Sequence, residues 1–205
     1  METLQINMIN DIIASSLEKS MSYDQYRDLV NELTENNSTT GSEKTEALAN
    51  YTALNNRRMK RWDKTVKVSD DTKATVQNSK KNLTWLVLTE SWCGDAAHII
   101  PVINKVAELN KNIDYRIVLR DKNEALMNEF LTNGGKSIPK LIMIDNDTKK
   151  VENTFGPRPS VATQLVNDYK ARHGKLTPEF KEDLQRWYNK DKGQSVIEDL
   201  LKVLA

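Results

Sequence analysis

The chain has 205 residues, which favours one domain with extensions over two equal domains, because domains typically hold about 100–200 residues. Thirty basic and twenty-nine acidic residues give a net charge of +1, so no overall field attracts nucleic acid or an anionic membrane. No apolar stretch approaches the roughly 20 residues that cross a bilayer, the N-terminus lacks the basic start of a signal peptide, and the single cysteine excludes an internal disulfide. We therefore expect an unprocessed cytoplasmic protein, since a lone thiol is least exposed to adventitious pairing in the reducing cytosol.

Residues 1–81 are predicted to form a helical N-terminal extension. Apolar residues recur at spacings of three and four between residues 26 and 33 and again between residues 48 and 62. Ser22 and Gln25 have the spacing of a capping box for the first of these helices, and Ser42 is a candidate N-cap for the second. Ser69, followed by two aspartates that suit the positive end of a helix, predicts a further short helix.

Residues 82–171 are predicted to form one α/β domain in which strands and helices alternate. The run 83–89 is short, apolar and bounded by polar residues, as expected of a strand buried on both faces. An Asn146-Asp147 turn between the last two strands predicts a hairpin. The expected strands are 83–89, 113–119, 140–144 and 150–155, and the expected helices begin at Cys93, cover 123–131 and begin near Ser160. This pattern predicts a central mixed sheet of about four strands flanked by helices.

Residues 172–205 are predicted to return to helices and to pack on the domain as a C-terminal extension. Thr177 and Pro178 form the N-cap and first-turn pair that commonly begins a helix. A second helix is expected to begin near Ser195 and to bury its leucine and isoleucine side chains.

The segment TESWCGDAAHIIP, residues 89–101, places Cys93 where the first strand gives way to a helix. Unpaired N–H groups and the dipole at a helix N-terminus stabilise a thiolate and lower a thiol pKa of about 8.5 by roughly one unit. Glu90 and Asp95 oppose this effect, because a like charge at roughly 6 Å costs on the order of 1–3 kcal/mol. A reactive thiolate therefore needs a nearby cation, and the candidates for this electrostatic tuning are Arg120 and Arg158.

Residues 83–171 resemble a thioredoxin domain. The order of elements agrees, ESWCGDA stands where that family has its WCGPC-type site, Pro101 lies where its first helix is commonly kinked, and SIPKLIMI resembles the segment that carries its cis-proline. The longer set ESWCGDAA, LRDKNEALM, LTNGGKSIPKLI and GPRP is similar to a bacterial branch of the superfamily, in which helices flank the domain and the second cysteine is absent.

This resemblance implies a thioredoxin-like fold in which half of the redox site is missing. Ala96 occupies the position of the resolving cysteine, and Val87 occupies the position of the buried acid that assists that cysteine. Dithiol disulfide reductase activity is therefore not expected, because the second thiol normally resolves the mixed disulfide. The resemblance further implies a cis bond before Pro139, although sequence alone favours trans. The implied catalytic residue is Cys93, and the implied substrate groove consists of Trp92, Gly94, Asp95, Ile138 and Pro139.

Two functions from different classes follow from this site. In the first, Cys93 performs monothiol thiol-disulfide chemistry on a protein or peptide partner, and glutathione or another low-molecular-weight thiol resolves the mixed disulfide as co-substrate. In the second, the protein is a non-catalytic module that binds an extended peptide or protein segment in the groove. The retention of an exposed Trp-Cys-Gly sequence slightly favours the thiol chemistry, and the oligomeric state is left open.

Three further features receive structural interpretations. The basic run RRMKRWDK, residues 57–64, is read as a solvated helix face with Met59 and Trp62 packed inward rather than as a nucleic-acid site. His98 does not share the helix face above Cys93, so it is read as a structural or surface residue. One cysteine and two histidines provide no recognised spacing for a metal site, and a glutathione-assisted iron–sulfur site is a weak alternative because CGDA lacks the serine usual in monothiol glutaredoxins.

Overall fold

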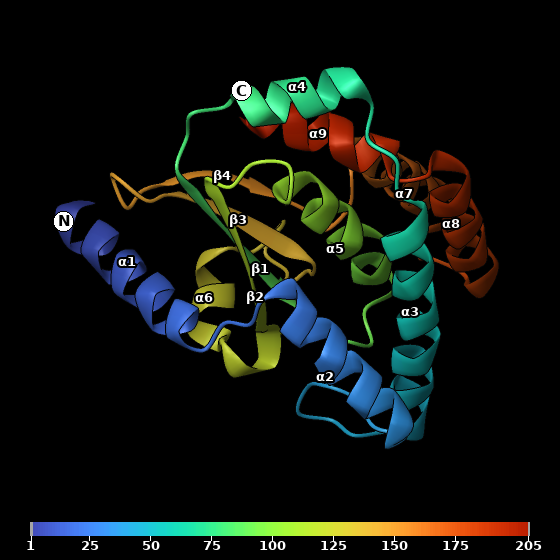
Figure 1. Ribbon diagram of the computed structural model, residues 1–205. Helices are drawn as coiled ribbons and strands as arrows, with labels where there is room; N and C mark the ends of the chain where they lie inside the picture. The colour runs from blue at the N-terminus through green and yellow to red at the C-terminus, as the bar shows by residue number, and fades with distance from the viewer. Residues whose placement is uncertain (1, 205) are drawn as a thin grey trace.

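A four-stranded mixed sheet lies at the centre of the protein, as the computed structural model shows for residues 2–204, with side chains described from residue 7 onward (Figure 1). The strands are β1 (Leu83–Thr89), β2 (Ile113–Leu119), β3 (Lys140–Asp145) and β4 (Val151–Phe155), arranged in the order β2-β1-β3-β4. β1 runs parallel to β2 and antiparallel to β3, and β4 closes the hairpin with β3. Every residue of β1 is buried, because β1 has a strand on each side and helices on each face. The predicted α/β fold with its mixed sheet is confirmed.

The helices that connect the strands agree with the expected order. α5 (Gly94–Ala107) leads from β1 to β2, and α7 (Ser160–His173) follows β4. Between β2 and β3 lie a short 3-10 turn, η1 (Arg120–Lys122), and α6 (Glu124–Glu129), which is shorter than the predicted helix over 123–131. α5 and α6 lie on opposite faces of the sheet (Figure 1).

Four helices precede the sheet, namely α1 (Glu2–Glu18), α2 (Tyr23–Glu35), α3 (Glu46–Thr65) and α4 (Asp70–Asn78). The capping box of Ser22 and Gln25 and the N-cap at Ser69 are confirmed. The predicted N-cap at Ser42 is wrong, because Thr45 accepts the hydrogen bond from the Leu48 N–H and begins α3 instead. The Ser42 N–H is used elsewhere, where it donates to Asp121 at 3.2 Å.

The N-terminal helices pack against the sheet and against α5. Met21 and Ile117 exchange two backbone hydrogen bonds of 2.8 Å, so the chain before α2 pairs with the outer edge of β2. α2 packs on β2 and on α3, and α3 packs along α5. Met59 and Trp62 of α3 are buried, as predicted for the inward face of the basic run. The start of α5 is therefore covered by a segment that is far away in the sequence.

The C-terminal helices cover α5 from another direction. They are α8 (Pro178–Asp191), which begins at the predicted Thr177 cap, and α9 (Gln194–Leu204). α9 packs against α5, β4 and α4, and Figure 1 shows α4 and α9 side by side. Ile197, Leu200 and Leu204 of α9 are buried as expected. No helix among residues 2–204 is long and apolar enough to cross a membrane.

The turn between α8 and α9 contains a glycine whose replacement tests this packing. Gly193 has a φ of +80°, and a Cβ there would lie 2.8 Å from Cγ2 of the buried Val102 in α5. Gly174 has a similar φ of +75°, but a Cβ there meets nothing within 4 Å. Both substitutions by alanine incur the left-handed backbone penalty of about 1–2 kcal/mol, whereas only Gly193→Ala adds an overpacking cost of about 1–3 kcal/mol.

We therefore expect Gly193→Ala to lower the free energy of unfolding by about 1–3 kcal/mol more than Gly174→Ala does. Urea denaturation of the two variants measures the difference. Equal free energies of unfolding for the two variants would mean that the turn at Gly193 does not pack closely against Val102 of α5.

Candidate functional site

Cys93 lies at the N-cap of α5, beside the loop that precedes β3. Its backbone is extended, with φ −75° and ψ 114°, and its carbonyl oxygen accepts the first helical hydrogen bond from the Ala97 N–H at 3.2 Å. The thiol donates to the carbonyl oxygen of Ile138 at an Sγ···O distance of 3.4 Å. The Ile138–Pro139 peptide bond is cis, as the resemblance implied. The structure thus brings together Cys93, Ile138 and Pro139 from positions 45 or more residues apart.

Burial decides the protonation state of this thiol. Cys93 is 8 % exposed, and its pKa is raised to about 12, first by burial and then by the charge of Asp95. The N–H groups of Ala96 and Asp95 and the charge of Arg158 act in the opposite direction, but they do not compensate. The sequence predicted the effects of the helix N-terminus and of the neighbouring charges on this pKa, whereas the largest effect is desolvation, which depends on the tertiary packing. The thiol is therefore protonated at neutral pH.

Asp95 is the centre of a buried polar contact between α5, α8 and the loop after β4. Its Oδ2 lies 2.6 Å from Nη2 of Arg158, and its Oδ1 accepts a hydrogen bond of 2.9 Å from the hydroxyl of Tyr188. Burial raises the pKa of Asp95, while Arg158 and Tyr188 lower it. Arg158 is therefore largely engaged by Asp95, so the cation expected to activate Cys93 instead neutralises the neighbouring carboxylate.

The turn before Cys93 is held by the N-terminal extension. The Ser91 N–H donates to Oγ1 of Thr40 at 2.8 Å, and the Thr40 N–H donates back to Oγ of Ser91 at 3.0 Å. Asn55 of α3 donates through Nδ2 to the Ser91 carbonyl oxygen at 2.9 Å. All three residues are buried, and buried polar groups of this kind require partners. Residues 40 and 55 are therefore part of the site, although they lie in a different segment of the chain.

Trp92 is half-buried between Arg120 and the loop that contains Gly41. The Arg120 guanidinium lies 5.0 Å from the centroid of the Trp92 ring, and Nε of Arg120 pairs with Asp121 at 2.8 Å. On the other side, a Cβ at Gly41 would be 3.2 Å from Nε1 of Trp92. Arg120 thus fixes the indole by a cation–π contact, whereas the charges of Asp95 and Arg158 shift the pKa of Cys93.

Glu90 is fully buried at the end of β1. Its Oε1 accepts a hydrogen bond of 2.9 Å from the Asp121 N–H, while its Oε2 has no partner among the described residues. Burial raises the pKa of Glu90 and so favours the neutral carboxyl group. Of the two carboxylates predicted to influence Cys93, Asp95 raises the pKa of the thiol. Glu90 instead accepts a hydrogen bond from the backbone after β2.

α3 and α8 meet above the first turn of α5. A Cβ at Gly94 would lie 3.6 Å from Nη1 of Arg58 and 4.0 Å from Nε2 of Gln185. The enclosure extends to His98, which is buried and stacks on Tyr188 with ring centroids 4.5 Å apart. Cys93 therefore lies under a cover formed by both extensions.

His98 has a structural role, as predicted, although it is buried rather than on the surface. Trp62 donates through Nε1 to Nδ1 of His98 at 2.9 Å, so His98 carries its proton on Nε2 and donates to Oε1 of Gln185 at 2.7 Å. Burial lowers the pKa of His98 to about 3. The neutral imidazole therefore joins α3, α5 and α8 through two hydrogen bonds.

Several residues that complete this site could not be assigned to it from the sequence. Thr40 and Asn55 hold Ser91, Tyr188 holds Asp95, and Arg58 and Gln185 approach Gly94. They lie in the extensions, and the only one within a feature noted in the sequence is Arg58, in the basic run interpreted as a solvated face. Only the position of α3 and α8 in the fold brings them to the N-terminus of α5.

Comparison with known proteins agrees with this fold. The profile of a family described as thioredoxin matches residues 41–170, which is more than half of the chain. A crystal structure of a protein of unknown function from Pseudomonas aeruginosa is similar, with a TM-score of 0.59 and 15 % identity over 90 % of this chain and 97 % of that chain. An HIV epitope scaffold is also similar, with a TM-score of 0.55 and 18 % identity over 90 % of this chain and 98 % of its own. No curated protein matches the chain.

These structural similarities extend over the flanking helices. At 15 % and 18 % identity they show the fold alone. Because each covers 90 % of this chain, the shared fold includes much of the extensions and not only the four strands and their connecting helices.

The burial of Cys93 predicts slow alkylation. Only the thiolate reacts with iodoacetamide, and the folded protein holds the thiol protonated with a pKa of about 12. We expect the rate in the folded protein to show no inflection near the ordinary thiol value of about 8.5, whereas the same protein in guanidinium chloride should show that inflection. Mass spectrometry of samples quenched across the pH range measures both profiles. An inflection at or below the ordinary value in the folded protein would contradict the prediction.

The buried histidine predicts loss of stability in acid. The folded-state pKa of His98 is about 3, below its ordinary value of 6.5, so between these pH values the unfolded chain binds the extra proton. Stability therefore falls as the pH decreases from about 6.5 towards 3, by as much as about 1.4 kcal/mol per pH unit. Urea denaturation of the wild type and of His98→Gln across this range measures the contribution. His173→Gln, which removes the other, exposed histidine, is the matched control, and equal slopes for wild type and His98→Gln would reject the assignment.

Proposed function

Because the chain belongs to the thioredoxin family, we propose that it is a thioredoxin-fold binding module that holds an extended segment of a partner protein beside Pro139, without disulfide exchange. The observation that carries this proposal is the state of Cys93, which is buried and has a pKa of about 12. A thiol in this state is a poor nucleophile, because the thiolate is the attacking species.

The positions that surround Cys93 support the same conclusion. Ala96 is 2 % exposed and Val87 is fully buried, so the resolving thiol and its assisting acid are both replaced by packed apolar side chains. Arg158 is paired with Asp95, and Arg120 lies on Trp92. No described cation is therefore placed to hold Cys93 as a thiolate against its burial.

The loop before Pro139 is the surface proposed for the partner. Its residues Lys136 and Ser137 are accessible, next to the buried Ile138 that accepts the Cys93 hydrogen bond. In thioredoxins the backbone before this proline pairs with an extended segment, and such strand addition depends on main-chain groups rather than on thiol chemistry. The exposed Leu131 and the half-buried Trp92 offer apolar side chains at the borders of this loop and of the Cys93 turn.

The rigidity of the site suits binding. The turn before Cys93 is held by Thr40 and Asn55, and Asp95 is held by Arg158 and Tyr188. A pre-organised surface loses little conformational entropy when a partner binds. We propose that the flanking segments 1–81 and 172–205 act together as this support, and that the protein works in the reducing cytoplasm, where its single thiol stays free.

Monothiol exchange is the second candidate, and the position of the sulfur favours it. Sγ lies at the start of α5, at the position of the family's WCGPC-type motif, and 3.4 Å from the Ile138 carbonyl oxygen. The Cys93 thiolate would attack a partner disulfide, forming a mixed disulfide and releasing one partner thiolate. A glutathione thiolate would then release the second partner thiolate, and a second glutathione would free Cys93 as glutathione disulfide leaves. The two partner thiolates take up the protons that the two glutathione thiols lose.

A photocrosslinker at Ser137 separates the two functions. We expect p-benzoylphenylalanine in place of the half-buried Ser137 to link a partner protein in cells. Binding through the groove predicts the same adduct in the Cys93→Ser background and in the presence of dithiothreitol, because no disulfide is involved. Mass spectrometry of the purified adduct identifies the partner and the linked peptide.

The control places the same crosslinker at Lys150, which is exposed at the start of β4, at the opposite end of the sheet from Pro139. An adduct at position 137 that is no stronger than at position 150 would reject the binding module. An adduct that forms only with Cys93 present would favour monothiol exchange instead.

A further inference from the structure

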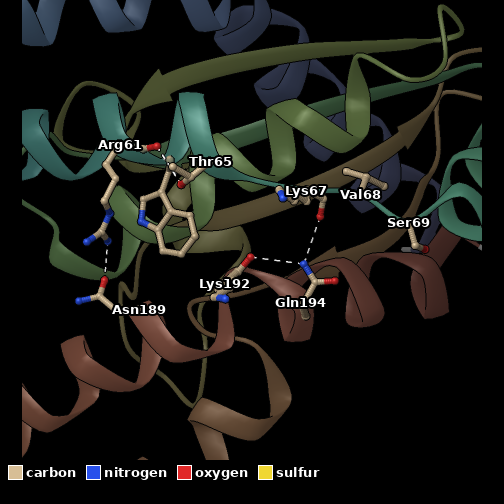
Figure 2. Close-up of a pocket in the computed structure, with 9 residues that line it drawn as sticks. Arg61, Thr65, Lys67, Val68, Ser69, Asn189, Lys192 and Gln194 are labelled. Atoms are coloured by element: carbon tan, nitrogen blue, oxygen red, sulfur yellow. Dashed lines mark hydrogen bonds between the residues drawn. The ribbon is translucent and has the colours of Figure 1, made fainter.

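A pocket lies between the N-terminal and the C-terminal extension. It has a volume of about 590 Å³ and is formed by the end of α3, the segment that leads into α4 and the turn between α8 and α9. Figure 2 shows Arg61 and Lys67 on one side of this hollow and Asn189, Lys192 and Gln194 on the other. This volume is within the range of about 300–1,000 Å³ that is typical of small-molecule sites.

The charged side chains that line the pocket are all basic. They are Arg61, Lys67 and Lys192, and no aspartate or glutamate lines the pocket with them. None of the three forms an ion pair within the described part of the chain. The carboxylate of Asp191, next to Lys192, does not pair with that lysine. It accepts a hydrogen bond of 3.2 Å from the Ser195 N–H instead. The pocket therefore concentrates three positive charges in a protein whose net charge is only +1.

Other contacts fix the shape of the pocket. The Arg61 guanidinium lies over the Trp62 ring, 5.1 Å from its centroid, and donates to the Asn189 amide oxygen. Gln194 donates through Nε2 to the carbonyl oxygens of Lys67 at 3.1 Å and of Lys192 at 3.4 Å. Trp62 and Val68 provide the apolar part of the lining. The pocket thus combines a basic rim with an apolar surface for a small organic group.

We propose that this pocket binds a small organic phosphate, with the phosphate group between Arg61, Lys67 and Lys192. Three cationic residues that line one pocket suit a multiply charged anion better than a carboxylate with a single charge. The Arg61 guanidinium offers a planar pair of donors to phosphate oxygens, and Lys67 and Lys192 add two further positive charges. The cationic residues come from three separate segments and line one pocket, whereas a nucleic-acid surface extends such residues along a face.

The same arrangement predicts that the ligand links the two extensions. Arg61 and Lys67 belong to the N-terminal extension, and Lys192 belongs to the C-terminal extension. A ligand that contacts both segments binds only the folded chain, so it raises the free energy of unfolding by mass action. At about 100 times the dissociation constant, the midpoint of thermal unfolding should rise by about 5–10 °C.

Titration of the full chain with inorganic phosphate and with glycerol 3-phosphate, followed by calorimetry and thermal unfolding, tests the proposal. We expect one saturable site, tighter binding of glycerol 3-phosphate than of inorganic phosphate, and no effect of glycerol. The variants Lys67→Gln and Lys192→Asn should each weaken binding about tenfold, because each removes a charge-assisted contact. Asparagine is used at position 192 because Lys192 has a φ of +57°, which asparagine tolerates.

The matched control is Lys64→Gln, which removes an exposed charge from the same basic run outside the pocket. It should change the dissociation constant less than twofold. Three outcomes would overturn the proposal: no saturable binding of either phosphate, equal weakening by Lys64→Gln, or preferential binding of a single-stranded oligonucleotide that glycerol 3-phosphate does not displace. The last outcome would identify the basic run as a nucleic-acid surface.

Discussion

The enclosure of the turn between β1 and α5 is the constraint on which the rest of the site depends. Ser91 is bound from the N-terminal extension by Thr40 and Asn55, and Asp95 is bound by Arg158 and by Tyr188 of α8. Each partner satisfies a polar group that burial would otherwise leave unpaired. The same enclosure removes water from Cys93, and the loss of hydration keeps its thiol protonated. One packing arrangement therefore fixes the shape of the turn and limits the chemistry of the cysteine.

The residues at the positions of the resolving cysteine and of its assisting acid also fit this enclosure. Ala96 and Val87 pack as core residues, where the family pattern would require a second thiol and a buried acid. What remains is the cis peptide bond before Pro139, with the Cys93 thiol hydrogen-bonded to the carbonyl oxygen of Ile138. Such a groove needs only main-chain donors and acceptors to bind an extended segment. The replaced redox residues and the rigid support of the turn are the two features that support the proposed binding module.

The two extensions also build the basic pocket, and one side chain connects the two regions. Trp62 contributes to the lining of the pocket and donates its indole N–H to His98 of α5. His98 stacks on Tyr188, whose hydroxyl binds Asp95 beside Cys93. The basic run on α3, interpreted from the sequence as a solvated face, thus includes two residues, Arg61 and Trp62, that line a pocket between distant segments.

The sequence by itself determined the elements, because their signals are local. Alternation and apolar runs defined the four strands, hydroxyl caps defined the starts of α2, α4 and α8, and the Trp-Cys-Gly segment located the N-terminus of α5. The tertiary structure decided the state of Cys93, the pairing of Arg158 with Asp95 and the position of the extensions over the site. The physical reason is that hydrogen bonding and helix capping act between neighbours in the chain, whereas desolvation depends on everything packed around an atom. Thr40 and Tyr188 lie about 50 and 95 residues from Cys93, so no pattern within either segment indicated that they would exclude water from the thiol or hold its neighbours.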